Sequence, residues 1–208
     1  MMGARLRRWR HDLVRRWFFE PVSGRRADGS AVPGSRISPA TLIEHEDSLV
    51  LGENVAIGPF CFLEASGGVV IGEGVQIASH VAIVTYSPHQ SQRLLGPGYS
   101  AWPLSAGQQR PGWIAGPVHI GAYCFVGPHS LIEANTRIGR GSLVCAGSFV
   151  RGEYPDFVIL EGRPARVVGD TRKADARLLV RHPELRVLYD SWALAPQSAA
   201  LDGEPRLA

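Results

Sequence analysis

Residues 120–150 read IGAYCFVGPHSLIEANTRIGRGSLVCAGSFV, and an aliphatic residue recurs in this stretch at every sixth position. A period of six is neither the 3.6-residue period of an amphipathic helix nor the two-residue alternation of a half-buried strand. A fixed short period predicts a solenoid, in which each unit buries its apolar residue by stacking on its neighbours. The residues that carry the period are Ile120, Val126, Ile132, Ile138, Val144 and Val150.

The same period extends toward the N-terminus, with two-residue slips. One slip follows Leu49 and another falls at Ser66-Gly67-Gly68. A strand with one inward aliphatic residue and a tight turn accounts for the glycines that follow many of these positions. Cys61 and Cys124 stand four residues after a repeat position, where small residues recur, so we expect inert core thiols. The earlier repeat positions are Ile37, Ile43, Leu49, Leu51, Ile57, Leu63, Ile71, Ile77 and Ile83.

The composition of the chain is that of an ordinary soluble protein. It has 208 residues, of which 45% are hydrophobic and 20% charged. No apolar run reaches the roughly 18 residues of a membrane span, and the N-terminus lacks the pattern of a secretory signal. Cys61, Cys124 and Cys145 form neither a metal-binding pair nor a disulfide framework. We therefore expect a reducing compartment, the cytoplasm.

Two features together resemble one family. The first is the hexad of an aliphatic residue, glycine, two variable positions, a small residue and a further variable position. The second is the closing stretch 154–168, YPDFVILEGRPARVV, which contains G-R-P-A-R-V. Both are similar to the hexapeptide-repeat acyltransferases. The resemblance implies an all-β solenoid, a left-handed parallel β-helix shaped as a triangular prism with three hexads in each coil.

This resemblance covers residues 37–168. We expect them to form the catalytic β-helix, with a basic helix and linker at 1–36 and a helix and tail at 169–208. A helix is predicted at about 173–192, bent or split at His182-Pro183. The resemblance also implies acetyl-CoA as co-substrate and a homotrimer with active sites between subunits.

The repeat stops after Ile83 and resumes at Ile120, so residues 84–117 are predicted to leave the prism as a long irregular loop. An insertion of this length in a compact domain usually has a function. Tyr86, Tyr99 and Trp102 are candidate acceptor-binding residues, because exposed aromatic rings suit a sugar-binding surface. The alternative is that the loop's tryptophans pin it to the prism.

Acyl transfer to a hydroxyl or amine needs a base that takes the acceptor's proton, and histidine titrates in the right range. In the family that this chain resembles, the catalytic histidine follows the last strand before the loop, and His89 matches that position. Its alternative role is that of a solvated loop residue. Glu64 and Glu133 are candidates to orient the ring, since each follows the inward residue one coil below or above Ile83; a backbone carbonyl could also serve.

The resemblance implies that coenzyme A lies along the prism edge, held by backbone amides of late coils and by a basic residue of the closing motif. The matching cofactor-binding residues are Ala146, Gly147, Ser148, Arg163, Pro164 and Arg166. Arginine suits a phosphate through its fork of donors. This chain departs from the family pattern in having Phe125 in place of tryptophan and Arg163 in place of asparagine.

A zinc protein like the γ-class carbonic anhydrases, which share the prism, is an alternative because His80, His119 and His129 lie in the repeat region. Their spacing does not match that class, and we expect no metal site. His80 and His129 occupy the same hexad position, so the phasing predicts that they stack on adjacent coils.

The N-terminal 26 residues hold eight arginines against Asp12 and Glu20. Apolar residues recur at helical spacing among them. A basic amphipathic helix over residues 5–18 suggests peripheral contact with the inner face of a membrane, or a cap on the open end of the prism. No recognition motif for nucleic acid is present.

These observations lead to one functional hypothesis. The chain is predicted to be an acetyl-CoA-dependent acyltransferase that O-acetylates a sugar or a surface-polysaccharide precursor, with His89 as general base. Acetylation of a sugar amine or of a small xenobiotic is the close alternative. A non-catalytic trimeric scaffold is an alternative from a different class, because fold alone does not decide function.

Overall fold

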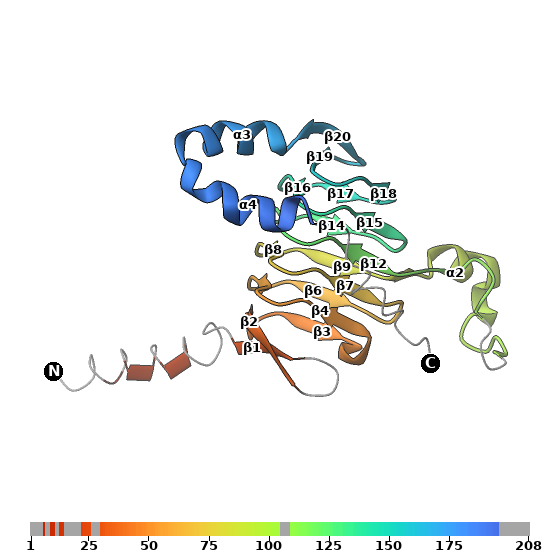
Figure 1. Cartoon of the computed structure of the whole chain (residues 1–208). Coiled ribbons are helices and arrows are strands. Elements are labelled where there is room, and N and C mark those ends of the chain that lie inside the picture. Colours follow the sequence, from red (N-terminus) through yellow and green to blue (C-terminus); the bar gives the residue numbers. More distant parts are fainter. Residues whose placement is uncertain are drawn as a thin grey trace.

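The computed structural model describes residues 6, 9, 10, 13, 14, 22–25, 30–104 and 109–195. Its body is a prism of stacked coils whose three faces are parallel sheets (Figure 1). We call these sheets the first, second and third faces, in the order in which the chain visits them. This is the left-handed parallel β-helix that the family resemblance implied.

Each face is a ladder of short strands, one from each coil. The first face contains β2 (Ala31–Ile37), β5 (Ala56–Ile57), β8 (Gln76–Ile77), β13 (Phe125–Val126), β16 (Leu143–Val144) and β19 (Val158–Gly162). The second contains β3 (Leu42–Glu44), β6 (Phe62–Glu64), β9 (Ala82–Val84), β14 (Leu131–Ile132) and β17 (Phe149–Val150). The third contains β4 (Leu49–Leu51), β7 (Val69–Ile71), β12 (Val118–Ile120), β15 (Thr136–Ile138) and β18 (Glu153–Tyr154).

The register of these ladders confirms three hexads in each coil. Ile83 pairs with Ile132, and Ile132 pairs with Val150, so positions three hexads apart stack directly. Residues at these inward positions are buried, and so are the predicted core thiols Cys61 and Cys124. Because every coil contributes the same short side chains, the core is a continuous apolar column that no single coil could form.

The irregularities of the repeat all lie at one corner of the prism, between the second and third faces. The slip at 66–68 separates β6 from β7, and the 3-10 helix η1 (Glu46–Ser48) separates β3 from β4. The long insertion separates β9 from β12. The core therefore stays in register although this corner varies in length from coil to coil.

The insertion is more ordered than the sequence suggested, so the prediction of an irregular loop was wrong in part. Strands β10 (Tyr86–Ser87) and β11 (Ile114–Ala115) pair antiparallel as a two-stranded stem. Beyond it come α2 (His89–Leu95) and the 3-10 helix η2 (Gly96–Gly98). Residues 90–95, QSQRLL, are mostly good helix formers, and this local preference was hidden by the glycines and prolines around them. Figure 1 shows α2 projecting from the prism on the side away from α3 and α4.

Near both ends of the chain, the structure differs from the predicted domain boundaries. Strand β1 (Val22–Arg25) pairs antiparallel with β2, so this part of residues 1–36 extends the first face instead of forming a linker. At the other end, β20 (Ala165–Asp170) folds back antiparallel on β19, past the predicted boundary at 168. Most of the predicted basic helix lies outside the described residues; Leu6, Trp9, Arg10, Leu13 and Val14 are helical.

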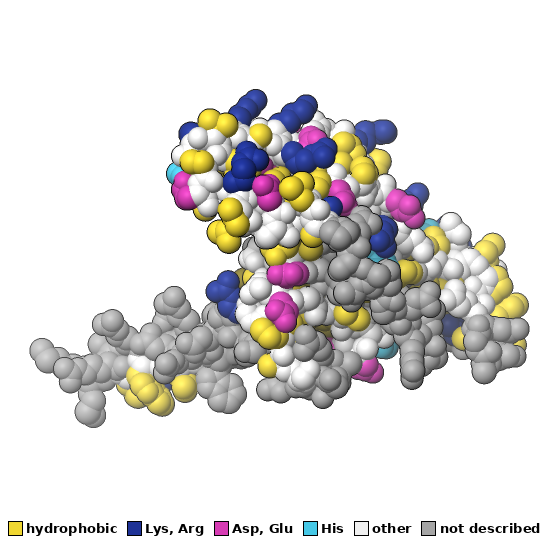
Figure 2. All heavy atoms as spheres, in the orientation of Figure 1, with side chains coloured by type: hydrophobic (Ala, Val, Ile, Leu, Met, Phe, Trp, Pro, Cys, Tyr) yellow, Lys and Arg dark blue, Asp and Glu magenta, His cyan; other side chains and the backbone are white. Residues whose placement is uncertain are grey.

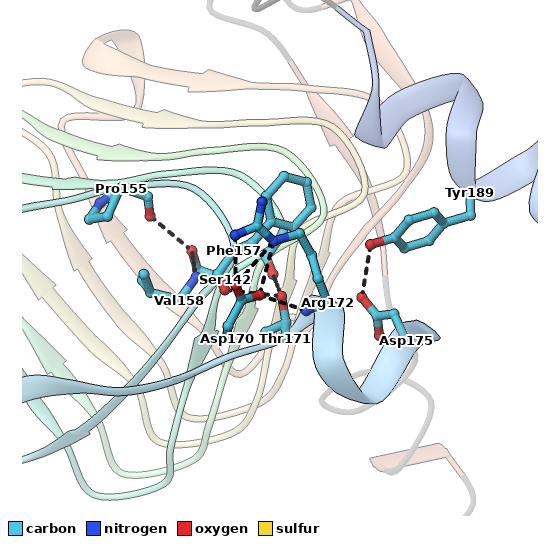
Figure 3. A network of polar contacts seen from close by, with 10 residues as sticks. Ser142, Pro155, Phe157, Val158, Asp170, Thr171, Arg172, Asp175 and Tyr189 are labelled. Atoms are coloured by element: carbon cyan, nitrogen blue, oxygen red, sulfur yellow. Dashed lines mark hydrogen bonds and ion pairs between the residues drawn. The ribbon is translucent and has the colours of Figure 1, made fainter. Parts of the chain in front are cut away.

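The C-terminal helix is split as expected, into α3 (Arg172–Arg181), the 3-10 helix η3 (Pro183–Leu185) and α4 (Arg186–Ala193). Trp192 attaches this hairpin to the prism, because its ring lies 4.5 Å from that of Tyr123 and 5.8 Å from that of Phe157. Figure 3 shows Arg172 beside the Phe157 ring and paired with Asp170, and the Tyr189 hydroxyl donating to Asp175. Across the described part of the chain, no helix is long and apolar enough to cross a membrane.

Candidate active site

The insertion leaves the prism at Thr85, whose amide and hydroxyl are both bonded to the prism. The Thr85 hydroxyl donates to Glu64 Oε2 over 2.6 Å, and its amide donates to the same oxygen over 3.1 Å. The hydroxyl also accepts the amide of Gly67 at 2.8 Å. Thr85 is completely buried, so these bonds are shielded from water.

Glu64 is the partner of Thr85 on the coil below, and the residue is 2% exposed. Its second oxygen accepts the amide of Ser66 at 2.9 Å. Burial raises the pKa of Glu64, but the hydrogen bonds from Ser66 and Thr85 outweigh burial and leave the pKa below its ordinary value. The carboxylate is therefore ionised at neutral pH and serves as an acceptor for three donors.

The returning end of the insertion meets the same corner. The amide of Gly116 donates to the Thr85 carbonyl over 3.0 Å, and Asn135 Nδ2 donates to the Ala115 carbonyl over 3.2 Å. Gly67 has no room for a side chain, since a Cβ there would lie 2.9 Å from that of Thr85. Both ends of the insertion are thus fixed to the prism at one point.

His89 is exposed and is the first residue of α2. Its Nδ1 lies 2.7 Å from the Ser87 hydroxyl. When Nδ1 carries the ring proton, it donates to Ser87 Oγ and leaves the Nε2 lone pair free to accept a proton from another molecule. The arrangement therefore suits a general base that acts through Nε2.

The structure does not bring the two candidate orienting acids to His89. Both oxygens of Glu64 accept hydrogen bonds at the corner, from Ser66 and Thr85. Glu133 forms an ion pair with Arg151 at 3.6 Å. The bond to the ring is made by Ser87, which the sequence analysis did not single out. A serine two residues before a candidate histidine was the signal that could have identified it.

Two aromatic residues of the insertion stack on each other, and a third lies under an arginine. Tyr86 and Trp113 stack across the stem, with ring centroids 5.0 Å apart and planes 9° apart. Arg110 lies over the Tyr99 ring and its Nε donates to the Tyr99 carbonyl. Trp102 keeps 40% of its surface exposed. The role of Tyr86, Tyr99 and Trp102 in acceptor binding remains a prediction.

The predicted coenzyme residues gather at the last coils. Leu131 and Phe149 of the second face line a shallow groove together with Arg163 and Pro164, which belong to the closing motif. Arg163 Nε donates to the Gly147 carbonyl over 2.7 Å, so the closing motif is tied to the predicted amide turn. A Cβ at Gly147 would meet nothing within 4 Å, which leaves the turn open on its outer side.

The remaining members of this set differ in exposure. Ala146 and Arg166 are exposed and available to a ligand. Ser148 is buried, and its hydroxyl donates to the Cys145 carbonyl over 2.7 Å. Any contact of Ser148 with a coenzyme would therefore involve its backbone and not its hydroxyl.

His80 and His129 stack on adjacent coils, as the phasing predicted, with ring centroids 4.8 Å apart and planes 9° apart. Phe60 continues the column one coil below, 5.1 Å from His80. All three adopt left-handed backbone angles, with φ between 59° and 61°, at equivalent turns. Within the described ranges, no three histidine, cysteine or acidic side chains are grouped as a metal site would require.

Comparisons with known proteins agree with this architecture. The family model described as bacterial transferase hexapeptide (six repeats) matches residues 114–152. Serine acetyltransferase 4 of Arabidopsis thaliana is 28% identical over 155 residues, which cover 72% of this chain and 39% of that protein. The chain thus spans well under half the length of this relative.

Two solved structures share the fold. A hexapeptide-repeat acetyltransferase of Vibrio cholerae superposes with a TM-score of 0.55 at 20% identity, covering 76% of this chain and 78% of that one. The same Vibrio protein has also been solved in complex with acetyl coenzyme A. A maltose O-acetyltransferase of Clostridium difficile superposes with a TM-score of 0.51 at 23% identity, and the match covers 77% of this chain and 74% of that one. The chain therefore resembles the hexapeptide-repeat transferases in sequence over residues 114–152, and it shares the three-faced prism of these solved structures.

Proposed function

We propose that the protein is an acetyl-CoA-dependent O-acetyltransferase in which His89 is the general base. The observation that carries this proposal is the bond between His89 Nδ1 and Ser87, on an insertion fixed to a prism with the fold of known acetyltransferases. The acetyltransferases among the similar proteins support the same reaction class.

The proposed reaction is a direct transfer between two bound substrates. His89 Nε2 removes the proton of the acceptor hydroxyl as its oxygen attacks the thioester carbonyl. The tetrahedral intermediate collapses, the bond between the carbonyl carbon and sulfur breaks, and the imidazolium returns its proton to the coenzyme thiolate. The products are the acetyl ester and free coenzyme A, and Ser87 keeps the ring oriented throughout.

The coenzyme would lie along the groove beside Leu131, Phe149, Arg163 and Pro164. Apolar side chains suit the pantetheine arm, and the exposed guanidinium of Arg166 suits a phosphate. The complex of the Vibrio relative with acetyl coenzyme A supports a coenzyme of this kind.

The proposed assembly is a homotrimer with sites between subunits. Because α2 projects away from the prism, His89 is presented outward, and the coenzyme groove of a neighbouring subunit would complete the site. The residues of one chain would then supply the base and those of the next the coenzyme.

A sugar or polysaccharide precursor is the proposed acceptor. The half-exposed Trp102 and the stacked rings of Tyr86 and Trp113 offer flat apolar surfaces, on which the C–H face of a pyranose can pack. The maltose O-acetyltransferase with the same fold supports this class of acceptor.

We also propose that the protein works in the cytoplasm, with residues 5–18 resting on the acidic inner face of a membrane. Leu6 and Trp9 are 56% and 60% exposed, and arginines surround them in the sequence. Exposed apolar residues among arginines are typical of peripheral membrane helices.

The test is substitution of the base. His89→Ala should reduce the release of coenzyme A from acetyl-CoA and a sugar acceptor by at least about 100-fold, the usual scale of a general base. His182→Ala, which changes an exposed histidine of the C-terminal hairpin, is the matched control and should keep full activity. Acetyl-CoA should raise the melting temperature of both variants. Wild-type turnover by His89→Ala would contradict the proposal.

A further inference from the structure

No hydrogen bond joins Glu64 to His89 in this structure, but Glu64 binds Thr85, the residue at which the insertion that carries His89 leaves the prism. Register places Glu64 beside Val84, one coil apart, and Thr85 is the next residue along the chain. The Glu64 carboxylate therefore lies below the point at which the chain leaves the prism. Among the described residues, Glu64 is the only charged one that is almost completely buried.

Thr85 connects the outgoing and returning strands of the insertion to the prism. Its amide and hydroxyl donate to Glu64, its hydroxyl accepts from Gly67, and its carbonyl accepts from Gly116. We call Glu64, Thr85, Gly67 and Gly116 the corner clamp. All of its bonds run between segments far apart in the sequence, so their loss would release the base of the insertion without opening the apolar core.

The path from the clamp to His89 is short. Only residues 86–88 separate Thr85 from His89. Tyr86 and Ser87 are held by pairing with β11 and by the Tyr86–Trp113 stack, and Ser87 bonds to the imidazole. A displacement at Thr85 would therefore be transmitted along the stem to the ring.

We propose that Glu64 and Thr85 are positioning residues for the transfer reaction, and that they act through the stem to fix the place of His89. This inference rests on the proposed function of His89. A general base must lie within hydrogen-bond reach of the proton it removes, and a shift of about 1 Å can cost a factor of 100 in rate. The buried carboxylate serves here as an anchor and takes no part in proton transfer.

Thr85→Val tests the inference, because valine keeps the shape of threonine and removes the hydroxyl that joins Glu64 to Gly67. We expect kcat to fall roughly 10- to 100-fold. The KM for acetyl-CoA and the thermal shift on acetyl-CoA binding should stay at wild-type values, because the coenzyme groove lies elsewhere. Thr85→Ser keeps the hydroxyl and should restore most of the rate.

Ser35→Ala is the matched control. Ser35 is 3% exposed, and its hydroxyl donates to the Gly52 carbonyl and accepts the amide of Val55, so it also joins two coils. It lies on β2 of the first face, two coils below the one from which the insertion leaves. This variant should lose stability as Thr85→Val does and keep wild-type kcat.

The outcomes separate this inference from the proposed function. If His89→Ala remained active, the assignment of the base would fail and the clamp would have nothing to position. If His89→Ala were inactive but Thr85→Val kept wild-type kcat, the clamp inference alone would be overturned. Should Thr85→Val fail to fold, Glu64→Asp carries the same test, because it keeps the charge and withdraws the carboxylate by one methylene. A folded Glu64→Asp with unchanged kcat would overturn the inference equally.

Discussion

At the scale of single residues, the contact between Ser87 and His89 orients the ring of the candidate base. An exposed imidazole can rotate and exchange its ring proton between two nitrogens. The hydroxyl 2.7 Å from Nδ1 favours one orientation of the ring, and when Nδ1 carries the ring proton, Nε2 is the basic nitrogen. Because Ser87 also belongs to the stem, the same residue ties the ring to the backbone that carries it.

Ser87→Ala should therefore lower kcat/KM by about 10-fold, less than the loss of the base itself, because the imidazole remains but is no longer held. Ser87→Thr should retain most of the activity, since it keeps the hydroxyl. Steady-state release of coenzyme A measures both variants. Equal rates for Ser87→Ala and wild type would show that this bond does not orient the base.

At the scale of elements, the connections at the corner between the second and third faces differ in length from coil to coil, while the strands that they join stay in place. Turns of different lengths are accepted here because the inward residues on either side stay in register. The longest insertion requires the most anchoring, and the Glu64 carboxylate provides it. A buried charge is tolerated only when its lone pairs are satisfied, as they are by Ser66 and Thr85.

The depressed pKa of Glu64 makes stability depend on pH. A carboxyl whose folded pKa lies below its unfolded value stabilises the fold above the unfolded value, about 4.3 for glutamate, and loses this contribution as the pH falls through the folded pKa. The groups that face it are Ser66 and Thr85, with Glu44 as its register neighbour on β3. Acid should therefore weaken the clamp.

Glu64→Gln should destabilise the protein at pH 7 by about 2 kcal/mol, because the amide nitrogen cannot accept the hydrogen bonds that the carboxylate accepts. The difference from wild type should shrink as the pH falls below the unfolded pKa of about 4.3 and through the lower folded pKa. Urea unfolding at several pH values measures the difference. If the difference in unfolding free energy between the two proteins stayed constant across this pH range, the charge of Glu64 would not contribute to stability.

At the scale of the whole molecule, the two functional parts lie on separate regions of one chain. The insertion projects on one side, while the closing motif and the C-terminal hairpin lie at the last coils (Figure 1). Figure 2 shows lysine and arginine side chains gathered along the outer margin over α3. This separation favours an active site completed between subunits.

Mixed assembly tests that arrangement. His89→Ala and Arg163→Glu should each be inactive alone, the first for lack of the base and the second through repulsion of the coenzyme phosphates. If sites form between subunits, co-refolding the two variants should restore part of the activity, because some sites combine a wild-type base with a wild-type groove. Light scattering should give three times the mass of one chain. A monomeric mass, or no recovery on mixing, would contradict the proposed assembly.

The sequence by itself determined the solenoid. A six-residue period depends only on which side chains point inward, so it predicted the repeat and the buried thiols. The family resemblance supplied three hexads in each coil, and the histidine stack followed from that phasing. The pairing of Ser87 with His89 and the clamp of Glu64 and Thr85 were decided by the tertiary structure. The reason is physical: Glu64 and Thr85 are 21 positions apart, and only the stacking of two coils brings a carboxylate within 2.6 Å of the hydroxyl where the insertion begins.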